Sequence, residues 1–171
     1  MDTVLISDAN IFIDLYKVGL LNDFFLLPCK MVTTDLVLNE VITGKKELHQ
    51  YQVSGRLEVI TASSDELVKI VSLMEGNLSL PDCSILYFAG EYSYILITGE
   101  KKLRQVASKY SLHVHGVLYV LDLLVNYGIL STGKAIESLL KLLEINPRLP
   151  IQISKKKILD WKNGIRCGCE C

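Results

Sequence analysis

The chain has 171 residues, half of them apolar, and a formal net charge of −1 at pH 7. This length fits a single domain that buries a sizeable hydrophobic core. Because the net charge is close to zero, the protein is not a polycation that would attract nucleic acid over its whole surface. Any binding to nucleic acid therefore requires a local basic patch.

The sequence has no apolar run that approaches the ~18 uninterrupted residues of a membrane-spanning helix. The opening segment Met1-Asp2-Thr3 lacks basic residues, and the apolar run that follows it is too short for a signal peptide. We therefore expect a soluble, cytoplasmic protein that does not interact with membranes.

The five cysteines fall into two groups. Cys29 and Cys83 lie in apolar contexts, which is typical of small core residues. Cys167, Cys169 and Cys171 form a C-x-C-x-C tail that matches no zinc pattern with a second ligand pair. We expect this tail to be flexible and reduced, and a soft-metal or redox role is the alternative.

The chain opens with an apolar run that predicts a buried strand at residues 4–7. Asp8 follows this strand, and a helical stretch begins with Ile11 and Ile13. Further strands are predicted at residues 31–33, 57–60, 94–98 and 113–114. Further helices are predicted at residues 36–42, 45–53, 64–74, 80–89, 103–107, 117–127, 132–143 and 154–161.

Strands and helices alternate along the chain, which predicts a three-layer α/β/α sandwich with a mostly parallel central sheet. We expect residues 1–127 to form the main domain, which carries the site. Residues 128–171 are predicted to add a C-terminal helical extension and the flexible cysteine-containing tail to the same domain.

Two acids follow predicted buried strands. Asp8 ends the strand at residues 4–7, and Glu100 follows the strand at residues 94–98. In open α/β sheets, ligands bind just beyond the carboxyl ends of the strands. We therefore expect both carboxylates at one edge of the sheet.

Two further acids lie on apolar helix faces. Asp82 is in the first turn of its predicted helix, on the face that Ile85 and Leu86 share. Glu40 shares its face with Val37. Because a carboxylate is costly to bury without a partner, these positions predict that both side chains join the same site.

Several carboxylates in one small volume repel each other, and a hard divalent cation, Mg²⁺ or Mn²⁺, usually relieves the repulsion. Each acid also has a purely structural alternative. Asp8 is then a helix N-cap, Glu40 a surface or ion-paired acid, Asp82 a complement to the helix dipole, and Glu100 a loop acid. We favour the metal site, because without it all four structural alternatives would have to be true at the same time.

Five short segments stand in a characteristic order and spacing along the chain. They are residues 6–10 (ISDAN), 34–41 (TDLVLNEV), 80–89 (LPDCSILYFA), 95–104 (ILITGEKKLR) and 114–121 (VHGVLYVL). Together they resemble the PIN domain, the metal-dependent nuclease fold that includes VapC-like toxin ribonucleases. The resemblance covers residues 3 to 125 and implies a PIN-like α/β/α fold.

The resemblance implies a role for each of the four acids in catalysis and metal binding. Asp8 and Asp82 would be the principal ligands of Mg²⁺ or Mn²⁺, and Glu40 would complete the cluster. Glu100 stands where the family usually has an aspartate. Its extra methylene would carry the carboxylate about one bond length further out, which puts its part in activity in doubt.

Residues around the acids also match the family. Asn10 would orient the first acid by hydrogen bonding, and Ser84 and Thr98 would support the ligands in the same way. Basic side chains directly after Glu100 are the best candidates for binding the nucleic-acid backbone. These are Lys101, Lys102 and Arg104.

The function implied by the resemblance is Mg²⁺- or Mn²⁺-dependent hydrolysis of RNA phosphodiester bonds. The family also implies a homodimer and, for a toxin of a toxin–antitoxin pair, a partner antitoxin protein. The alternative is a catalytically weak or inactive PIN-like domain that binds nucleic acid or protein. A flavodoxin-like phosphoryl site is disfavoured, because the sequence has no G-x-G-x-x-G or G-K-[ST] motif.

Overall fold

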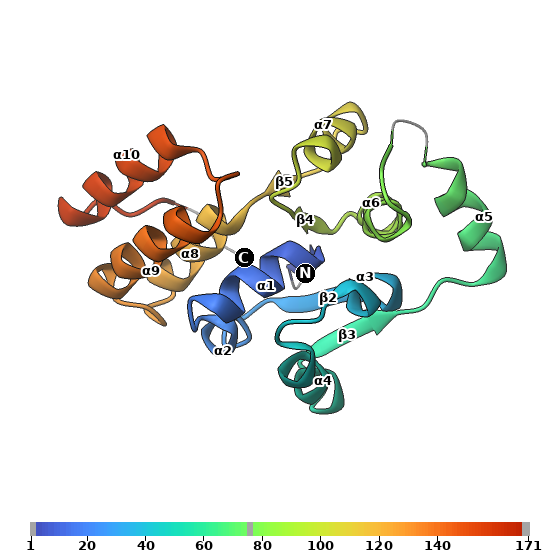
Figure 1. Cartoon of the computed structure of the whole chain (residues 1–171), viewed down its shortest axis with the longest axis horizontal. Helices are drawn as coiled ribbons and strands as arrows, with labels where there is room; N and C mark the ends of the chain where they lie inside the picture. Colours follow the sequence, from blue (N-terminus) through green and yellow to red (C-terminus); the bar gives the residue numbers. More distant parts are fainter. Residues whose placement is uncertain (1–2, 75–76, 169–171) are drawn as a thin grey trace.

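The computed structural model describes residues 3–74 and 77–168. These residues contain a five-stranded sheet in which all neighbouring strands are parallel (Figure 1). The strands are β1 (Val4–Ser7), β2 (Lys30–Thr34), β3 (Leu57–Ile60), β4 (Ile95–Ile97) and β5 (Val114–His115). Their order across the sheet is β3-β2-β1-β4-β5. Helices flank the sheet, so the prediction of an α/β/α fold is confirmed.

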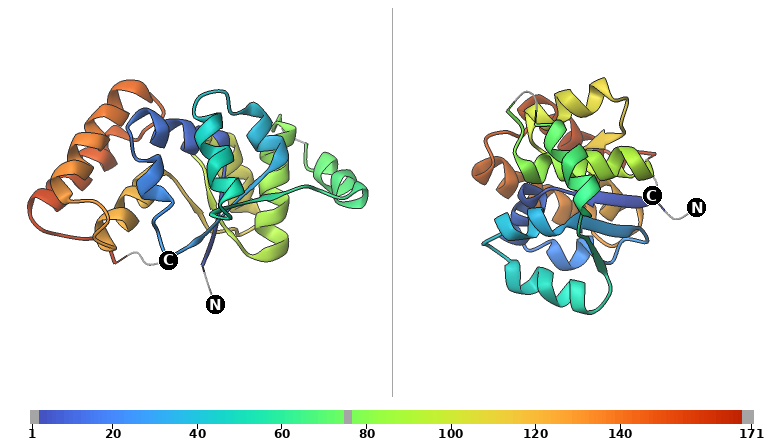
Figure 2. Two further views of the ribbon diagram at one scale, coloured as in Figure 1. Left: turned by 90° about the horizontal axis from the view of Figure 1, so that it is seen from below. Right: turned by 90° about the vertical axis from the view of Figure 1, so that its right-hand side faces the viewer.

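The helices of the described residues alternate with these strands and then continue beyond the sheet. They are α1 (Ala9–Lys17), α2 (Leu21–Phe24), α3 (Asp35–Glu40), α4 (Lys45–Val53), α5 (Ser64–Ser72), α6 (Leu80–Tyr92), α7 (Lys101–Lys109), α8 (Val117–Asn126), α9 (Thr132–Ile145) and α10 (Ile151–Lys162). Figures 1 and 2 show α5 at one end of the molecule and α9 and α10 at the other.

The strand order places β1 in the centre of the sheet, between β2 and β4. Leu5 pairs with Ile95 and with Met31 in the two neighbouring strands. Because these three strands are parallel, their carboxyl ends lie at the same edge. Asp8 follows β1 at this edge, as the sequence predicts. Thr98, which was predicted as the last residue of its strand, directly follows β4.

Helix α6 packs against β1, β2 and β4. It buries Ile85 and Phe88 completely or nearly so, and a buried side chain of this size contributes roughly 1.5–3 kcal/mol to stability. Since α6 returns from the carboxyl edge to feed β4, its first turn lies at that edge. This packing therefore brings Asp82 to the same side of the sheet as Asp8.

Several element ends differ from the predictions. The predicted helix at residues 36–42 stops at Glu40, and Gly44 is the N-cap of α4 with a φ of 81°. A Cβ at Gly44 would lie 2.9 Å from Cδ2 of Tyr16, so both its conformation and its contacts require glycine. The last helix begins at Ile151, directly after Pro150, three residues before the predicted start.

The C-terminal helices pack on the domain rather than extending away from it. Asp122 of α8 forms an ion pair with Lys157 of α10, and Trp161 of α10 is buried. The side-chain amide of Asn126 donates a 2.7 Å hydrogen bond to the carbonyl of Cys167. These contacts attach residues 151–167 to α8.

The cysteine predictions, small core residues at Cys29 and Cys83 and a reduced C-terminal tail, hold at one described position and fail at two. Cys83 is buried and free, whereas Cys29 and Cys167 are disulfide-bonded. The sequence pattern shows spacing but not which sulfurs meet after folding, which is why the prediction is wrong there. Cys169 and Cys171 lie outside the described residues.

Across residues 3–74 and 77–168, none of the helices combines the length and the apolar character needed to cross a membrane.

Candidate functional site

Asp8 lies between β1 and α1 and is only 2% exposed. Its Oδ1 accepts a 2.9 Å hydrogen bond from the backbone N–H of Ile11, which makes it the N-cap of α1. Its Oδ2 accepts a 2.5 Å hydrogen bond from the hydroxyl of Thr98. Asp8 therefore caps helix α1, and the same contacts fix its carboxylate at the edge of the sheet, where it can also serve as a ligand.

The Asp8 carboxyl resists ionisation. Burial raises its pKa to about 6, the hydrogen bonds from Thr98 and Ile11 oppose this rise, and the charges of Asp82 and Asp14 add to it. A nearby positive charge favours the ionised form of such a group. Asp8 therefore has the electrostatic properties of a cation ligand.

Asp82 lies in the first turn of α6 and is partly buried. Its Oδ2 accepts a 2.9 Å hydrogen bond from the hydroxyl of Ser79, the N-cap of this helix. The charge of Asp82 raises the pKa of Asp8 and also that of Glu40. The negative charge of Asp82 therefore acts on both of the other acids.

Glu40 is the last residue of α3 and is exposed. The sequence places it on an apolar helix face, but the backbone becomes extended at Val41, so the face does not continue past it. Partial desolvation, followed by the Asp82 charge, raises the pKa of Glu40. Its carboxylate is therefore at the solvent-facing side of the acidic group.

Ser84 joins the helices that carry Glu40 and Asp82. Its hydroxyl lies 2.7 Å from the hydroxyl of Thr34, the N-cap of α3, and donates a 2.7 Å hydrogen bond to the carbonyl of Pro81. Because the single hydroxyl hydrogen of Ser84 is used on Pro81, Thr34 donates to Ser84. The pair is fully buried and fixes the start of α3 against the start of α6.

Glu100 is the N-cap residue of α7 and is partly buried. Its Oε2 lies 2.8 Å from Nη1 of Arg148, a residue of the segment between α9 and α10. Its backbone N–H donates a 3.0 Å hydrogen bond to the hydroxyl of Thr98. The Glu100 carboxylate is therefore paired with a cation from the C-terminal part of the chain.

The acids fit a hard cation in their chemistry, although they do not form a compact ligand set. Within residues 3–74 and 77–168, no group of three or more His, Cys, Asp or Glu side chains could hold a metal ion. Asp8 and Asp82 supply carboxylate oxygens, and Asp8 is buried among negative charges. Mg²⁺ is commonly held by one or two carboxylates with water completing its shell.

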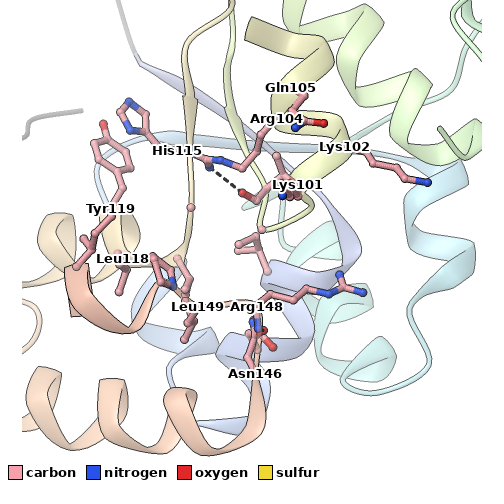
Figure 3. A pocket seen from close by; sticks show the side chains of 18 of the residues that line it. Lys101, Lys102, Arg104, Gln105, His115, Leu118, Tyr119, Asn146, Arg148 and Leu149 are labelled. Atoms are coloured by element: carbon pink, nitrogen blue, oxygen red, sulfur yellow. Dashed lines mark hydrogen bonds between the residues drawn. The ribbon is translucent and has the colours of Figure 1, made fainter. Parts of the chain in front are cut away.

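A cavity of about 1320 Å³ adjoins the acids at Thr98 and Gly99 (Figure 3). It lies between α7, α8 and the segment from Asn146 to Ile153, and its wall is rich in cations. The charged residues that line it are Lys101, Lys102, Arg104, Lys109, Arg148 and Lys157, together with Asp14 and Asp122. A local basic patch, which a nearly neutral protein needs in order to bind nucleic acid, is therefore present beside the acids.

The cavity also has an aromatic side. The rings of His115 and Tyr119 are stacked with their centroids 3.9 Å apart and an interplanar angle of 14°. Figure 3 shows this pair on the side of the cavity opposite Lys102 and Arg148. Burial, followed by the charges of Arg104 and His113, lowers the pKa of His115.

The family model described as DUF3368, PIN domain, matches residues 4–161. The chain belongs to the PIN-domain family. No curated protein shows a match to it. The PIN domain is generally a nuclease fold, and PIN domains usually use divalent metals. The match includes the four acids, the cavity and nearly all of α10.

The basic residues predicted from the sequence line the cavity of this PIN domain. Lys101 and Lys102 are exposed in the first turn of α7, and Nη1 of Arg104 donates a 3.0 Å hydrogen bond to the carbonyl of Thr98 (Figure 3). Arg104 therefore also supports the residue that holds Asp8. Binding of RNA by these three side chains stays a prediction.

The residues predicted to support the ligands have different outcomes. Thr98 holds Asp8 directly, and Ser84 acts through Thr34 on the helix that carries Glu40. Asn10 is exposed in the first turn of α1, and in the described part of the chain no hydrogen bond joins its side chain to Asp8.

Three residues near the site were missed by the sequence reasoning. Asp14 lies on α1 and raises the pKa of Asp8, and it accepts a 2.5 Å hydrogen bond from Asn146. Its position three residues after the buried Ile11 was a readable signal. Asn146 and Arg148 carried no such signal, because their partners lie 132 and 48 residues away in the sequence.

Proposed function

We propose that this PIN domain is a ribonuclease that requires Mg²⁺ or Mn²⁺ and hydrolyses RNA phosphodiester bonds. The observation that carries the proposal is the Asp8 carboxyl, which is buried at the carboxyl edge of the central strand and has a pKa of about 6. Fixing a carboxylate in this environment is unfavourable without a cation. The family membership supports the same conclusion, because PIN domains are generally nucleases.

Asp8 and Asp82 would hold the ion, and Glu40 would join from the solvent side. When bound, such an ion stabilises the negative charge that develops on a phosphoryl oxygen. Side chains of this domain orient the two carboxylates by hydrogen bonds. Thr98 holds Oδ2 of Asp8, and Ser79 holds Oδ2 of Asp82, so each carboxylate keeps its orientation before substrate arrives.

RNA is the substrate that the basic cavity supports best. Lys101 and Lys102 extend from α7 beside the residues that hold Asp8, and their ammonium groups are suited to phosphate oxygens. The stacked His115 and Tyr119 rings supply an aromatic surface on the far side of the cavity. Single-stranded RNA combines charged phosphates with exposed bases, which such walls accommodate.

We extend the proposal to a toxin role, which the resemblance to toxin ribonucleases supports. Expression in a bacterial host should arrest growth, and Asp8→Asn should remove the arrest at equal protein level. Growth arrest that persists with Asp8→Asn would exclude RNA cleavage as its cause. A partner antitoxin would be identified by its ability to restore growth when it is expressed together with the chain.

A second function, RNA binding without cleavage, is favoured by one observation. Within the described residues no three acids are grouped to hold a metal ion, and Glu100 is paired with Arg148. A domain of this kind would bind RNA through its cavity and leave it intact. Measuring binding and cleavage on the same RNA separates the two functions.

The test uses the full chain and a panel of labelled single-stranded and hairpin RNAs, with Mg²⁺, Mn²⁺ or a chelator. We expect cleavage with either ion, none with the chelator, and a loss of at least about a hundredfold in Asp8→Asn and Asp82→Asn. The matched control is Asp65→Asn, an exposed acid in the first turn of α5. It should cleave like the unchanged chain.

Equal cleavage by the unchanged chain and by both site variants would remove the ribonuclease proposal. Absence of cleavage with intact RNA binding would favour the second function. Thermal unfolding of each variant shows that the loss does not come from misfolding. Single-stranded DNA of the same sequence, tested beside the RNA, shows whether the substrate class is RNA.

A further inference from the structure

The turn Asn146-Pro147-Arg148 lies between α9 and α10 and contacts two acids beside the site. Nδ2 of Asn146 donates a 2.5 Å hydrogen bond to Oδ2 of Asp14 on α1. Nη1 of Arg148 lies 2.8 Å from Oε2 of Glu100 at the start of α7. The turn thus joins the C-terminal helices to both sides of the candidate site.

The turn also has an internal contact that fixes its shape. The backbone N–H of Arg148 donates a 3.0 Å hydrogen bond to Oδ1 of Asn146. Asn146 therefore uses its amide nitrogen on Asp14 and its amide oxygen on Arg148. These two hydrogen bonds fix the backbone position of Arg148.

Arg148 lies at the boundary between the basic cavity and the acids. It lines the cavity, and its guanidinium reaches Glu100, whose backbone N–H is bonded to the same Thr98 hydroxyl that holds Asp8. Figure 3 shows the Arg148 side chain directed away from Leu149 and Tyr119, toward the side on which Lys102 lies. A strand that passes from the cavity to the acids would meet this guanidinium.

The exposure of Arg148 leaves it able to bind a ligand. Its side chain is 57% exposed, whereas that of Glu100 is 28% exposed. A guanidinium carries five N–H donors in a planar fork, and the contact with Glu100 involves Nη1. The carboxylate fixes one side of the fork and leaves donors on the other side for an anion.

We propose that Arg148 binds a phosphate of the RNA strand next to the acids, and that Glu100 positions its guanidinium instead of ligating the metal ion. This inference rests on the proposed function, and it changes the role that the resemblance gives to Glu100. The longer side chain at position 100 explains the change, because it carries the carboxylate out to Arg148. Phosphate is the anion that the planar arginine fork recognises best in nucleic acids.

The first test measures RNA binding by fluorescence anisotropy of a labelled single-stranded RNA, with a chelator present so that no cleavage occurs. We expect Arg148→Ala to weaken binding roughly tenfold and to reduce the dependence of log K on log salt by about one phosphate contact. Arg148→Lys should recover part of the affinity, because it retains the charge without the fork. The matched control, Arg56→Ala, removes an exposed arginine just before β3 and should change neither quantity.

The second test measures Mn²⁺ binding by isothermal titration calorimetry without RNA. We expect Glu100→Gln to bind Mn²⁺ like the unchanged chain, whereas Asp8→Asn and Asp82→Asn bind it weakly. In the RNA assay Glu100→Gln should lose affinity, because the guanidinium is no longer held by a charge. In cleavage assays Arg148→Ala should raise KM more than it lowers kcat.

Two results would overturn the inference. One is unchanged RNA affinity in Arg148→Ala, and the other is a loss of Mn²⁺ affinity in Glu100→Gln as large as that in Asp82→Asn. Neither measurement depends on cleavage. An RNA-binding effect of Arg148 in a chain that never cleaves would disprove the ribonuclease proposal and leave the phosphate contact standing.

Discussion

The hydroxyl of Thr98 donates a 2.5 Å hydrogen bond to Oδ2 of Asp8, and so joins the residues that follow two neighbouring parallel strands. The two residues are 90 positions apart in the sequence. The bond exists because β1 and β4 are adjacent and in register, with Ser7 opposite Ile97. The position of the candidate ligand is therefore a property of the whole sheet and not of the first loop alone.

Thr98→Val keeps the shape of the side chain and removes this donor. We expect the pKa of Asp8 to rise above about 6, because one of the interactions that oppose the rise is lost. The free energy of unfolding should fall by about 1–3 kcal/mol, which is typical for a buried hydrogen bond to a carboxylate. Carbon-detected NMR titration of the Asp8 carboxyl and urea denaturation measure the two quantities.

The matched control for this change is Thr33→Val. The Thr33 hydroxyl donates a 2.9 Å hydrogen bond to the carbonyl of Ser7, and Thr33 is fully buried. Its loss should lower stability by a similar amount and leave the pKa of Asp8 near about 6. If Thr98→Val and Thr33→Val shift the pKa of Asp8 equally, the direct bond does not control it.

Stability should depend on pH through Asp8 when no divalent cation is present. Its pKa is about 6 in the folded chain and 3.8 in the reference state, so the folded chain holds this proton more tightly. The contribution favours folding below pH 3.8 and is lost as the pH rises through about 6. Above that pH, the free energy of unfolding is about 3 kcal/mol lower than it is below pH 3.8, because the buried carboxyl is ionised.

Asp8→Asn removes this titration. We expect its stability relative to the unchanged chain to be greater at pH 7.5 than at pH 4, as measured by urea denaturation with a chelator. Added Mn²⁺ should offset the loss above pH 6 in the unchanged chain, because a cation favours the ionised form. A stability difference that stays constant between the two pH values would show that Asp8 has no raised pKa.

Ser84→Ala should loosen the attachment between α3 and α6. The variant loses the contact with Thr34 and the bond to the carbonyl of Pro81, at a cost of about 1 kcal/mol in the free energy of unfolding. We expect Mn²⁺ affinity to fall roughly tenfold, because groups that orient ligands affect metal binding strongly. Calorimetry measures this change.

Ser138→Ala is the control for that experiment, since Ser138 is equally buried but lies on α9. It should leave Mn²⁺ affinity unchanged. A comparable loss of affinity in both serine variants would indicate a general effect of destabilisation on metal binding.

The sequence predicted the sheet well because its strands are short apolar runs that end at an acid, a glycine or a polar residue. Residues 4–7 and 57–60 were predicted with their observed bounds. The end of α6 was placed too early, because the helix continues through Gly90 to Tyr92 and stops where Ser93 takes a φ of 56°. Tertiary packing supports such a helix beyond its local signals.

The candidate site could be predicted only in part. The location of Asp8, Asp82 and Thr98 could be predicted because each stands at a strand end or a helix start, which fixes the edge of the sheet that it occupies. The pairing of Glu100 with Arg148 could not be predicted, because the turn after α9 reaches α7 only when the C-terminal helices dock. Local patterns contain no information about that docking.

The ion pair between Asp122 of α8 and Lys157 of α10 is one contact of that docking. Asp122 is 4% exposed, and burial raises its pKa although the ion pair with Lys157 opposes the rise. Lys157→Met would leave the carboxylate buried without its cation. We expect the free energy of unfolding to fall by about 3 kcal/mol at neutral pH, which is typical when one partner of a buried pair is removed.

A second change at the same contact should reverse most of this loss. In Asp122→Leu with Lys157→Met, both charges are replaced by apolar side chains, and the pair no longer has to be desolvated. Urea denaturation of the two single variants and the double variant gives the coupling energy of the pair. Because α10 closes one wall of the cavity, Lys157→Met should also weaken RNA binding, and the double variant should restore it. A double variant as unstable as Lys157→Met would show that the unpaired charge of Asp122 is not the cause.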